Sequence, residues 1–367
     1  MTRFAFIIHP IDARRDVSRK YWVARFLPLK VIEWFLKKKK PMLISKITGV
    51  RSITGAETEG WFIGCPLTPK MMLEMPLEEV YDKIVACCDL AADLGADIVG
   101  LGAFTAVIGD GGETISKRSR IAVTTGNSYT VASAIEGVLK AAELMDVKTE
   151  HATLAVVGAT GSIGKTCAQI LSTRFAQTIL IGRDLGKTEQ VANSIGNHVS
   201  ATVDITRLKE ADVVITVTSS ETDVILPEYL KVGSVICDVA RPRDVSIRVQ
   251  KERDDVLVIE GGVVSLPSEV NFGFDFGFPK NTAYACMSET MMLALENRAE
   301  SFTIGKVVSE EQVMETIEMA KRHGFMLSGF RSFEKVLSPE NIERVKAAVK
   351  RKREEIAKVG DKAHAET

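Results

Sequence analysis

The chain has 367 residues, of which 46% are hydrophobic and 26% are charged, which is the composition of a folded protein with room for two domains. Its formal net charge of −1 supplies no basic excess to neutralise phosphates, so we expect no nucleic-acid partner. Six cysteines with no CxxC pair and no metal-like Cys/His spacing argue against a disulfide framework or a metal centre, and they predict reduced thiols in a cytoplasmic protein.

The first 150 residues predict a mixed α/β domain, which we assign to the substrate. The opening apolar run is too short for a signal peptide and predicts a β-strand. Apolar periodicity predicts helices at 77–94 and 127–145, and a strand at 97–102 precedes a polar loop at 105–120. No uncharged apolar run is long enough to predict a membrane span.

Residues 21–36 mix aromatic and aliphatic side chains, and four lysines follow at 37–40. This composition favours an interfacial helix on an anionic membrane surface, which would place the protein at the membrane periphery through residues 21–40. An alternative is that the lysines dock an acidic acyl carrier protein by charge complementarity. A third interpretation is an ordinary helix packed on its domain with solvated lysines.

Residues 151–280 predict a Rossmann-like domain. Strands rich in β-branched residues alternate there with helical stretches, and they are expected at 153–158, 178–183, 211–217, 234–238 and 256–260. This alternation is typical of βαβ units and a parallel sheet. The predicted fold class is therefore α/β, with a Rossmann-like parallel sheet domain preceded by the mixed α/β substrate domain and followed by C-terminal helices.

The C-terminal part of the chain predicts helices. Helices at 282–298 and 309–322 fall within a segment, 281–335, that we expect to pack back on the N-terminal domain. The remainder, 336–367, predicts a charged helical tail whose last residues, 360–367, are expected to fray.

A glycine-rich turn joins the first predicted strand of the Rossmann-like domain to the next helix. It consists of Gly158, Ala159, Thr160, Gly161, Ser162, Ile163 and Gly164. Glycines at these positions permit a tight turn and close approach of a pyrophosphate to free N–H groups at a helix N-terminus. The alternative is a strand–helix turn without a ligand, but the strand-to-helix context favours dinucleotide binding.

The residues after the second strand of this domain discriminate between NAD and NADP. An acidic side chain there suits a ribose 2′-hydroxyl, whereas an arginine suits a 2′-phosphate. The chain has Arg183 followed by Asp184, so we predict NADPH as the cofactor. The alternative is that Arg183 is a solvated loop residue and that Asp184 only caps the following helix. We also place Thr218, Gly261 and Gly262 in the cofactor site.

Several sequence blocks occur together in a recognisable order: 15–19, 102–107, 124–130, 156–164, 261–264, 285–289 and 322–325. The set resembles the long-chain acyl-[acyl-carrier-protein] reductases of cyanobacteria, which reduce fatty acyl thioesters to fatty aldehydes with NADPH. The resemblance implies a long-chain acyl-ACP or acyl-CoA as the donor and an aldehyde-consuming enzyme as a partner. The segment 21–41 is longer and more basic than in that family, and the tail after Gly329 is additional.

The resemblance assigns the catalytic thiol to Cys286, since a cysteine of that family takes the acyl group from the donor. A thiolate can attack a thioester, and the resulting enzyme-bound thioester can accept a hydride. We expect the surrounding helix to begin near Asn281 or Thr282, where amide dipoles would lower the pKa of the thiol. Residue type alone favours a buried hydrophobe at this position, and Cys65 is the second candidate for the nucleophile.

Three polar residues are candidates to line the substrate cleft: Thr105, Thr125 and Asn127. An equally weighted alternative is that they cap helices or hold loops in place by hydrogen bonds. His9 and His323 are expected to be structural, so no acid–base partner of the thiol is identified. Backbone amides would then stabilise the oxyanion. Two other functions remain open: a shikimate- or amino-acid-type NADP dehydrogenase without covalent catalysis, and a non-catalytic NADP-binding protein.

Overall fold

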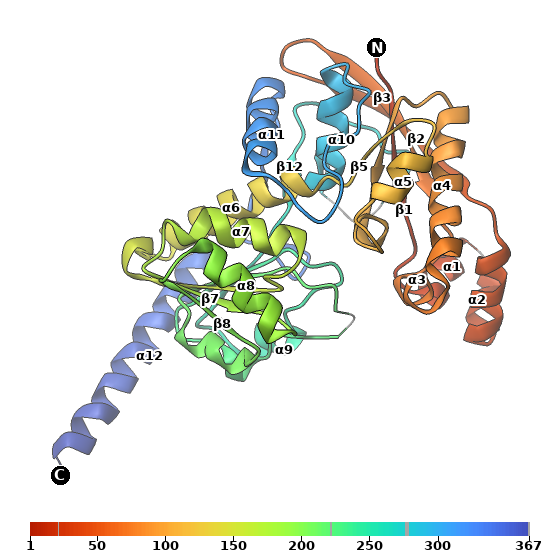
Figure 1. The fold of residues 1–367 in the computed structure, drawn as a ribbon. Coiled ribbons are helices and arrows are strands. Elements are labelled where there is room, and N and C mark those ends of the chain that lie inside the picture. Colours follow the sequence, from red (N-terminus) through yellow and green to blue (C-terminus); the bar gives the residue numbers. More distant parts are fainter. Residues whose placement is uncertain (21, 221, 276–278, 366–367) are drawn as a thin grey trace. The chain divides into compact units, whose positions relative to one another are not determined.

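In a computed structural model that describes residues 1–20, 22–220, 222–275 and 279–365, the chain forms two compact units (Figure 1). Unit 1 comprises Met1–Tyr129 and Val263–Met326, and unit 2 comprises Thr130–Gly262 and Leu327–Thr367. The chain therefore passes from unit 1 to unit 2 and back before it ends in unit 2. These transitions differ from the expected boundaries at 150, 280 and 335.

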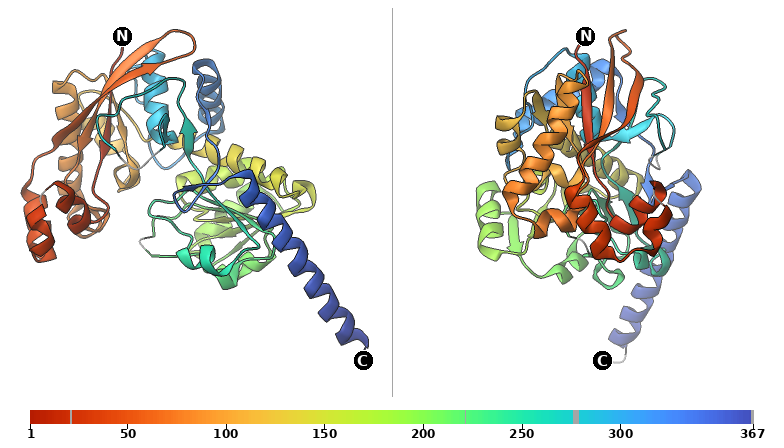
Figure 2. Two further views of the ribbon diagram at one scale, coloured as in Figure 1. Left: turned by 180° about the vertical axis from the view of Figure 1, so that it is seen from behind. Right: turned by 90° about the vertical axis from the view of Figure 1, so that its right-hand side faces the viewer.

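Unit 1 is built on a five-stranded sheet of order β2-β3-β1-β4-β5. Strands β1 (Phe4–Ile8), β3 (Glu57–Gly64), β4 (Ile98–Leu101) and β5 (Ala122–Thr124) are parallel. Strand β2 (Met42–Arg51) pairs antiparallel with β3 at one border of the sheet (Figure 2). The carboxyl ends of four parallel strands therefore lie along one edge.

Two helices cover the faces of this sheet (Figure 1). Alternate strand residues, such as Ile7 and Leu101, share a buried cluster with apolar residues of α4 (Leu77–Asp93). On the other face, α10 (Ala285–Leu295) lies so close to β4 that a side chain at Gly100 would overlap Thr290. Helix α10 is buried on nearly all sides, which explains why its sequence is not amphipathic.

The other elements of unit 1 lie around this core. They are α1 (Ala13–Lys20), η1 (Trp22–Phe26), α2 (Leu29–Lys38), α3 (Pro69–Glu74), η2 (Ala103–Ala106), α5 (Glu113–Arg118), β12 (Val263–Ser265), β13 (Thr282–Tyr284), α11 (Glu310–His323) and β14 (Met326–Leu327).

Unit 2 contains a six-stranded, fully parallel sheet of order β11-β10-β9-β6-β7-β8. The strand order reverses between β6 and β9, which is the doubly wound Rossmann arrangement and confirms the predicted fold class. The strands are β6 (Thr153–Val157), β7 (Gln177–Ile181), β8 (Val199–Thr202), β9 (Val213–Thr216), β10 (Val235–Asp238) and β11 (Leu257–Glu260).

Helices and short elements complete unit 2. They are α6 (Asn127–Leu144), whose first residues belong to unit 1, η3 (Thr149–His151), α7 (Ser162–Ser172), α8 (Leu185–Ile195), η4 (Ile205–Glu210), η5 (Pro227–Tyr229), α9 (Ile247–Glu252), β15 (Arg331–Ser332), β16 (Lys335–Val336) and α12 (Pro339–Ala365).

Two predicted helices differ in the structure. The helix expected at 282–298 begins only at Ala285, because Thr282–Tyr284 pair antiparallel with β12. The segment 21–36 divides into η1 and α2, because Pro28 lacks an N–H group and marks the start of a new helix; Tyr21 lies outside the described residues.

Two other expectations about the chain were also wrong. The loop expected at 105–120 includes the short helix α5. The tail was expected to fray from Gly360, but helix α12 continues to Ala365 as an extension of the Lys-, Glu- and Ala-rich stretch before it, and residues 366–367 lie outside the described part. No helix in the described part of the chain is long and apolar enough to cross a membrane.

Candidate functional site

The glycine turn between β6 and α7 contains two glycines that the fold itself requires. Gly158 has a φ of +83°, and a Cβ there would lie 2.7 Å from the carbonyl oxygen of Val217. A Cβ on Gly164 would overlap the carbonyl oxygen of Gly158, so this glycine allows α7 to pack against the turn. These are the tight-turn and helix-packing roles of a dinucleotide-binding turn.

Gly161, the central glycine, has no such packing requirement. It is the N-cap residue of α7, and an added Cβ would meet no described atom closer than 3.4 Å. The first N–H groups of a helix lack intrahelical acceptors, and a missing Cβ beside them leaves room for a phosphate. The turn therefore fits the pyrophosphate of a dinucleotide.

Thr218 lies beside this turn and is held there by Asp244, a residue that sequence reasoning missed. Strand β9 adjoins β6, and Gly158 contacts the backbone of Val217. The fully buried carboxylate of Asp244 accepts hydrogen bonds from the hydroxyl of Thr216 and from both the hydroxyl and the N–H of Thr218. Only the fold brings these segments together, so no local sequence signal identifies Asp244.

A second buried carboxyl, Asp238, ends strand β10. It accepts hydrogen bonds from the N–H groups of Ala240 and Val245, each at 3.0 Å. Burial raises the pKa of Asp238 to about 6, against the opposing effect of the nearby positive charge of Arg241. Asp238 and Asp244 therefore fix the loops at the carboxyl edge of this sheet.

Arg183 and Asp184 follow β7 and have different roles. The carboxylate of Asp184 accepts a hydrogen bond from the N–H of Lys187 at 3.1 Å and so caps α8. Arg183 is exposed and has no hydrogen bond or ion pair with any described residue. Its guanidinium is thus available for an anion, and its exposure also fits the alternative of a solvated loop residue. The helix cap expected for Asp184 is confirmed.

Gly261 and Gly262, also expected at the cofactor, follow β11. Strands β9 and β10 separate β11 from β6, so the strand order does not bring these glycines next to the turn. A Cβ on Gly261 would lie 2.7 Å from the side chain of Val239, and Gly262 has a φ of +76°. Packing and backbone conformation require glycine at these positions, and their place at the cofactor stays a prediction.

The cysteines of the chain differ in exposure. All six lie in the described part of the chain; Cys286 is partly exposed, whereas the buried ones are Cys65, Cys87, Cys88, Cys167 and Cys237. Burial raises the pKa of both Cys88 and Cys167 to about 12, which makes them poor nucleophiles. Cys65, the second candidate, interacts with Cys87 inside the core and is closed to solvent.

Cys286 is the second residue of α10, whose N-cap residue is Tyr284. The helix start expected near Asn281 or Thr282 was therefore wrong, but the thiol still lies in the first turn of a helix. A side chain at Gly126, which has a φ of +72°, would overlap the Cα atom of Cys286. The loop after β5 therefore packs directly on the backbone of Cys286.

Glu289 lies one turn beyond Cys286 and is completely buried. Its carboxylate accepts hydrogen bonds from the hydroxyls of Thr124 at 2.6 Å and Thr303 at 2.9 Å, and from the N–H of Tyr129 at 3.0 Å. Burial raises the pKa of Glu289, while these hydrogen bonds act in the opposite direction. Glu289 thus ties α10 to the loop that contacts Cys286, a role that needed a structure to recognise.

The other residues predicted at the substrate site are buried, with Thr105 in η2 and Thr125 in the loop after β5. The hydroxyl of Thr125 donates to the carbonyl of Thr303 at 2.9 Å, and the hydroxyl of Thr105 donates to the carbonyl of Gly102 at 2.8 Å. Asn127 is also buried, at the start of α6. Thr105 follows β4 and Thr125 follows β5, so both lie at the carboxyl edge of the sheet; their role toward a substrate stays a prediction.

Both histidines singled out in the sequence make structural hydrogen bonds. The Nε2 atom of His9 accepts from the N–H of Phe104 at 3.0 Å, and burial lowers the pKa of His9, which keeps the ring neutral. The buried ring of His323 lies between Ser52 at 2.8 Å and Glu296 at 3.0 Å. Neither ring is placed at Cys286 by these contacts.

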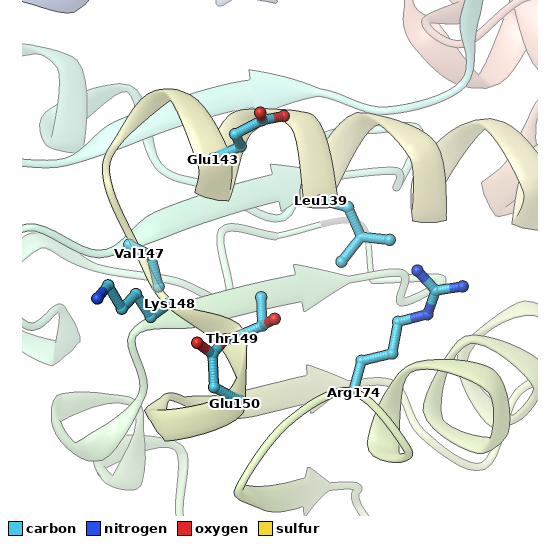
Figure 3. Close-up of a pocket in the computed structure, with 7 residues that line it drawn as sticks. All are labelled: Leu139, Glu143, Val147, Lys148, Thr149, Glu150 and Arg174. Carbon is cyan, nitrogen blue, oxygen red and sulfur yellow. The ribbon is translucent and has the colours of Figure 1, made fainter.

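A pocket of about 440 Å³ is present in unit 2 (Figure 3). It is lined by Leu139, Glu143, Val147, Lys148, Thr149, Glu150 and Arg174. Arg174 follows the C-terminal end of α7, whereas the glycine turn precedes the N-terminal end. The pocket therefore lies at the opposite end of α7 from the nucleotide-binding turn.

Comparison with known proteins agrees with the glycine-turn geometry. The family model of shikimate / quinate 5-dehydrogenase matches residues 140–260, which cover the sheet of unit 2. Unit 2 is an NAD(P)-binding domain. This match places the domain among those of NAD(P)-dependent dehydrogenases and reductases, and it leaves the choice between NAD and NADP open.

Two curated proteins are distant relatives over most of the chain. Aminotransferase PigE of Serratia sp. (strain ATCC 39006) is 31% identical over 346 residues, which cover 90% of this chain. The chain spans only 40% of the length of that protein. Long-chain acyl-[acyl-carrier-protein] reductase of Synechococcus elongatus is 28% identical over 330 residues, or 86% of this chain and 95% of that protein.

Among solved structures, L-tryptophan dehydrogenase from Nostoc punctiforme is similar with a TM-score of 0.43 and 13% identity. The alignment covers 95% of this chain and 88% of that one.

Proposed function

We propose that the protein reduces a long-chain fatty acyl thioester to a fatty aldehyde with NADPH, through an S-acyl intermediate on Cys286. The observation that carries this proposal is the partly exposed thiol in the first turn of α10, since the five other cysteines are buried. The similarity to the Synechococcus acyl-[acyl-carrier-protein] reductase over 86% of the chain supports the same chemistry.

The first half-reaction forms a thioester on the protein. The Cys286 thiolate attacks the carbonyl carbon of the donor thioester, and the donor sulfur leaves as a thiol after taking a proton. The partial positive charge at the start of α10 favours the thiolate over the thiol. Backbone N–H groups of the same helix turn are suitable donors for the oxyanion of the tetrahedral intermediate.

The second half-reaction releases the product. NADPH, held by the glycine turn and Arg183, would supply the hydride that reduces the carbonyl carbon of the S-acyl group. Collapse of the resulting thiohemiacetal breaks the carbon–sulfur bond, forms the aldehyde and returns the thiol of Cys286. One donor thioester, one NADPH and one proton thus yield one aldehyde, one free donor thiol and NADP⁺.

Arg183 supports the choice of NADPH, because its exposed guanidinium has no partner among the described residues and suits a 2′-phosphate. The donor is either an acyl carrier protein or coenzyme A, and the aldehyde passes to a consuming enzyme. Both assignments are part of this proposal.

Mass spectrometry tests the covalent step directly. Incubation with palmitoyl-CoA or palmitoyl-ACP without NADPH should add one palmitoyl group to Cys286, and later addition of NADPH should remove it as hexadecanal. Cys286→Ala should show neither adduct nor aldehyde. Cys167→Ala, at a buried thiol of unit 2, is the matched control and should retain both. Aldehyde formation by Cys286→Ala at the wild-type rate would refute the covalent mechanism and favour direct hydride transfer, as in the shikimate-type alternative.

A further inference from the structure

The described part of the segment after α1 exposes an unusual number of large apolar side chains. Helix α2 packs on unit 1 through Ile32 and Leu36, which are almost fully buried. Its outward side instead presents Val31, Trp34 and Phe35, and η1 adds Trp22 and Phe26. We call these five outward residues, together with the lysines at 37–40, the aromatic–lysine face.

The exposure of this face is high for such residues. Trp22 is 71% exposed, Phe26 77%, Trp34 57% and Phe35 53%. The spacing is helical in both elements, since Trp22 and Phe26 are four residues apart and Val31, Trp34 and Phe35 lie within one turn. Because Ile32 and Leu36 already anchor α2, the outer side chains are not needed to hold the helix on unit 1.

The charge around these aromatic rings is strongly positive. Between residues 22 and 40 there are six basic side chains and one acidic one, Glu33, which pairs with Lys70 at 3.6 Å. Lys38 places its ammonium 4.2 Å from the ring of Trp34, and Lys39 lies 5.7 Å from Phe35. Since the whole chain has a formal charge of −1, this basic excess is local to the face.

We propose that the aromatic–lysine face docks the protein on the surface of an anionic phospholipid bilayer. Aromatic rings bordered by lysines suit the boundary between head groups and acyl chains, where the rings enter and the ammonium groups remain with the lipid phosphates. An acidic carrier protein would complement the lysines, but it gives no reason to expose two tryptophans and two phenylalanines at more than half of their surface. The lipid surface satisfies both features of the face.

Helix α2 lies at the periphery of unit 1 (Figure 1), and it is too short to span a bilayer. Docking is therefore interfacial and reversible. The inference goes beyond the proposed reaction and does not depend on it, because binding to lipid requires neither NADPH nor turnover.

Tryptophan fluorescence of the full chain provides a direct readout. Of the three tryptophans, Trp22 and Trp34 lie on the face, whereas Trp61 is buried, with only 7% of its surface exposed. Vesicles of phosphatidylcholine mixed with phosphatidylglycerol should cause a blue shift and should co-sediment the protein. Vesicles of phosphatidylcholine alone should bind much more weakly, and added salt should reduce the binding to anionic vesicles.

Two variants separate the apolar and the basic contributions. Trp34→Ser/Phe35→Ser should weaken co-sedimentation more than about tenfold, because the inserted apolar area is lost. Lys37→Gln/Lys38→Gln should weaken it about 25-fold, or about fivefold per lysine. The matched controls change exposed residues elsewhere in unit 1, Met314→Ser for the apolar set and Lys117→Gln/Lys321→Gln for the basic set, and should bind like wild type.

Three outcomes would overturn the proposal. The first is an absence of binding to anionic vesicles, and the second is equal binding by the face variants and the wild type. The third is self-association or carrier-protein binding that depends on the face while vesicles do not bind, which would mean that another partner covers it. Urea unfolding of each variant shows whether it is folded, so a lost signal can be assigned to the face. Failure of this test leaves the Cys286 adduct unaffected, and failure of the adduct leaves vesicle binding unaffected.

Discussion

Replacing Glu289 by alanine should destabilise unit 1 more than an ordinary glutamate substitution. The hydrogen bonds that the carboxylate accepts inside the core include those from Thr124, Thr303 and the N–H of Tyr129. Alanine leaves these donors without an acceptor in a place that water does not reach. A buried donor without an acceptor costs at least about 1 kcal/mol. With three such donors, the free energy of unfolding should fall by about 3 kcal/mol.

Urea unfolding followed by circular dichroism measures this loss. The matched control is Glu318→Ala on α11, an exposed glutamate of unit 1, which should change the free energy of unfolding by less than about 0.5 kcal/mol. A loss below about 1 kcal/mol in Glu289→Ala would refute the structural role assigned to the three hydrogen bonds.

The pH dependence of stability tests the ionisation of the same group. Burial raises the pKa of Glu289 in the folded protein above that of the unfolded chain. The stability linked to this proton is therefore fully present below the unfolded pKa, about 4.3, and is lost as the pH rises through the folded pKa. Glu289→Gln keeps the shape but does not titrate, so wild type should lose stability relative to this variant as the pH rises. A constant difference would contradict the raised pKa.

Three further predictions concern unit 2. Gly161→Ala should weaken NADPH binding at least about tenfold in a fluorescence titration, and this variant should unfold near the same urea concentration as the wild type. Gly164→Ala should instead lower the free energy of unfolding, because its Cβ would overlap the backbone of Gly158. Arg183→Gln should weaken NADPH more than NADH, and equal losses measured by the same titration would remove its assignment to the 2′-phosphate. Asp238→Asn should flatten the pH dependence of the free energy of unfolding between about pH 4 and pH 6. The folded pKa of Asp238 is about 6, so the stability of the wild type falls as the pH rises through this range. An unchanged slope in the variant would contradict the raised pKa.

The Rossmann-like sheet was predictable from the sequence because its information is local. Five of its six strands are short runs rich in β-branched residues, and the glycine turn must follow a strand and precede a helix. The sixth strand, β8, was missed because Ser200 and Ala201 interrupt its β-branched residues. The antiparallel hairpin of β2 and β3 was not predicted, because β2 has one exposed face and its alternation of polar and apolar residues is interrupted by two register shifts.

The candidate nucleophile was inferred from the resemblance, since residue type alone favoured a buried hydrophobe at Cys286, and the buried residues that support it were not predicted. Glu289 and Thr303 belong to one network with Thr124, although about 180 residues separate Thr124 from Thr303. Asp244 is likewise invisible as the residue that holds Thr218 until the fold brings them together. Buried polar residues of this kind act through partners that sequence periodicity does not reveal.

The division of unit 1 into two chain segments affects the order in which the protein can fold. Helix α10 covers one face of the unit 1 sheet, yet it begins only at Ala285, after the whole inserted part of unit 2. A chain emerging from the ribosome therefore completes the Rossmann-like sheet while the earlier sheet still lacks its cover. During that interval the apolar face of the unit 1 sheet is accessible to other nascent chains and chaperones. The core of unit 1 is closed only when its second segment, Val263–Met326, has been synthesised.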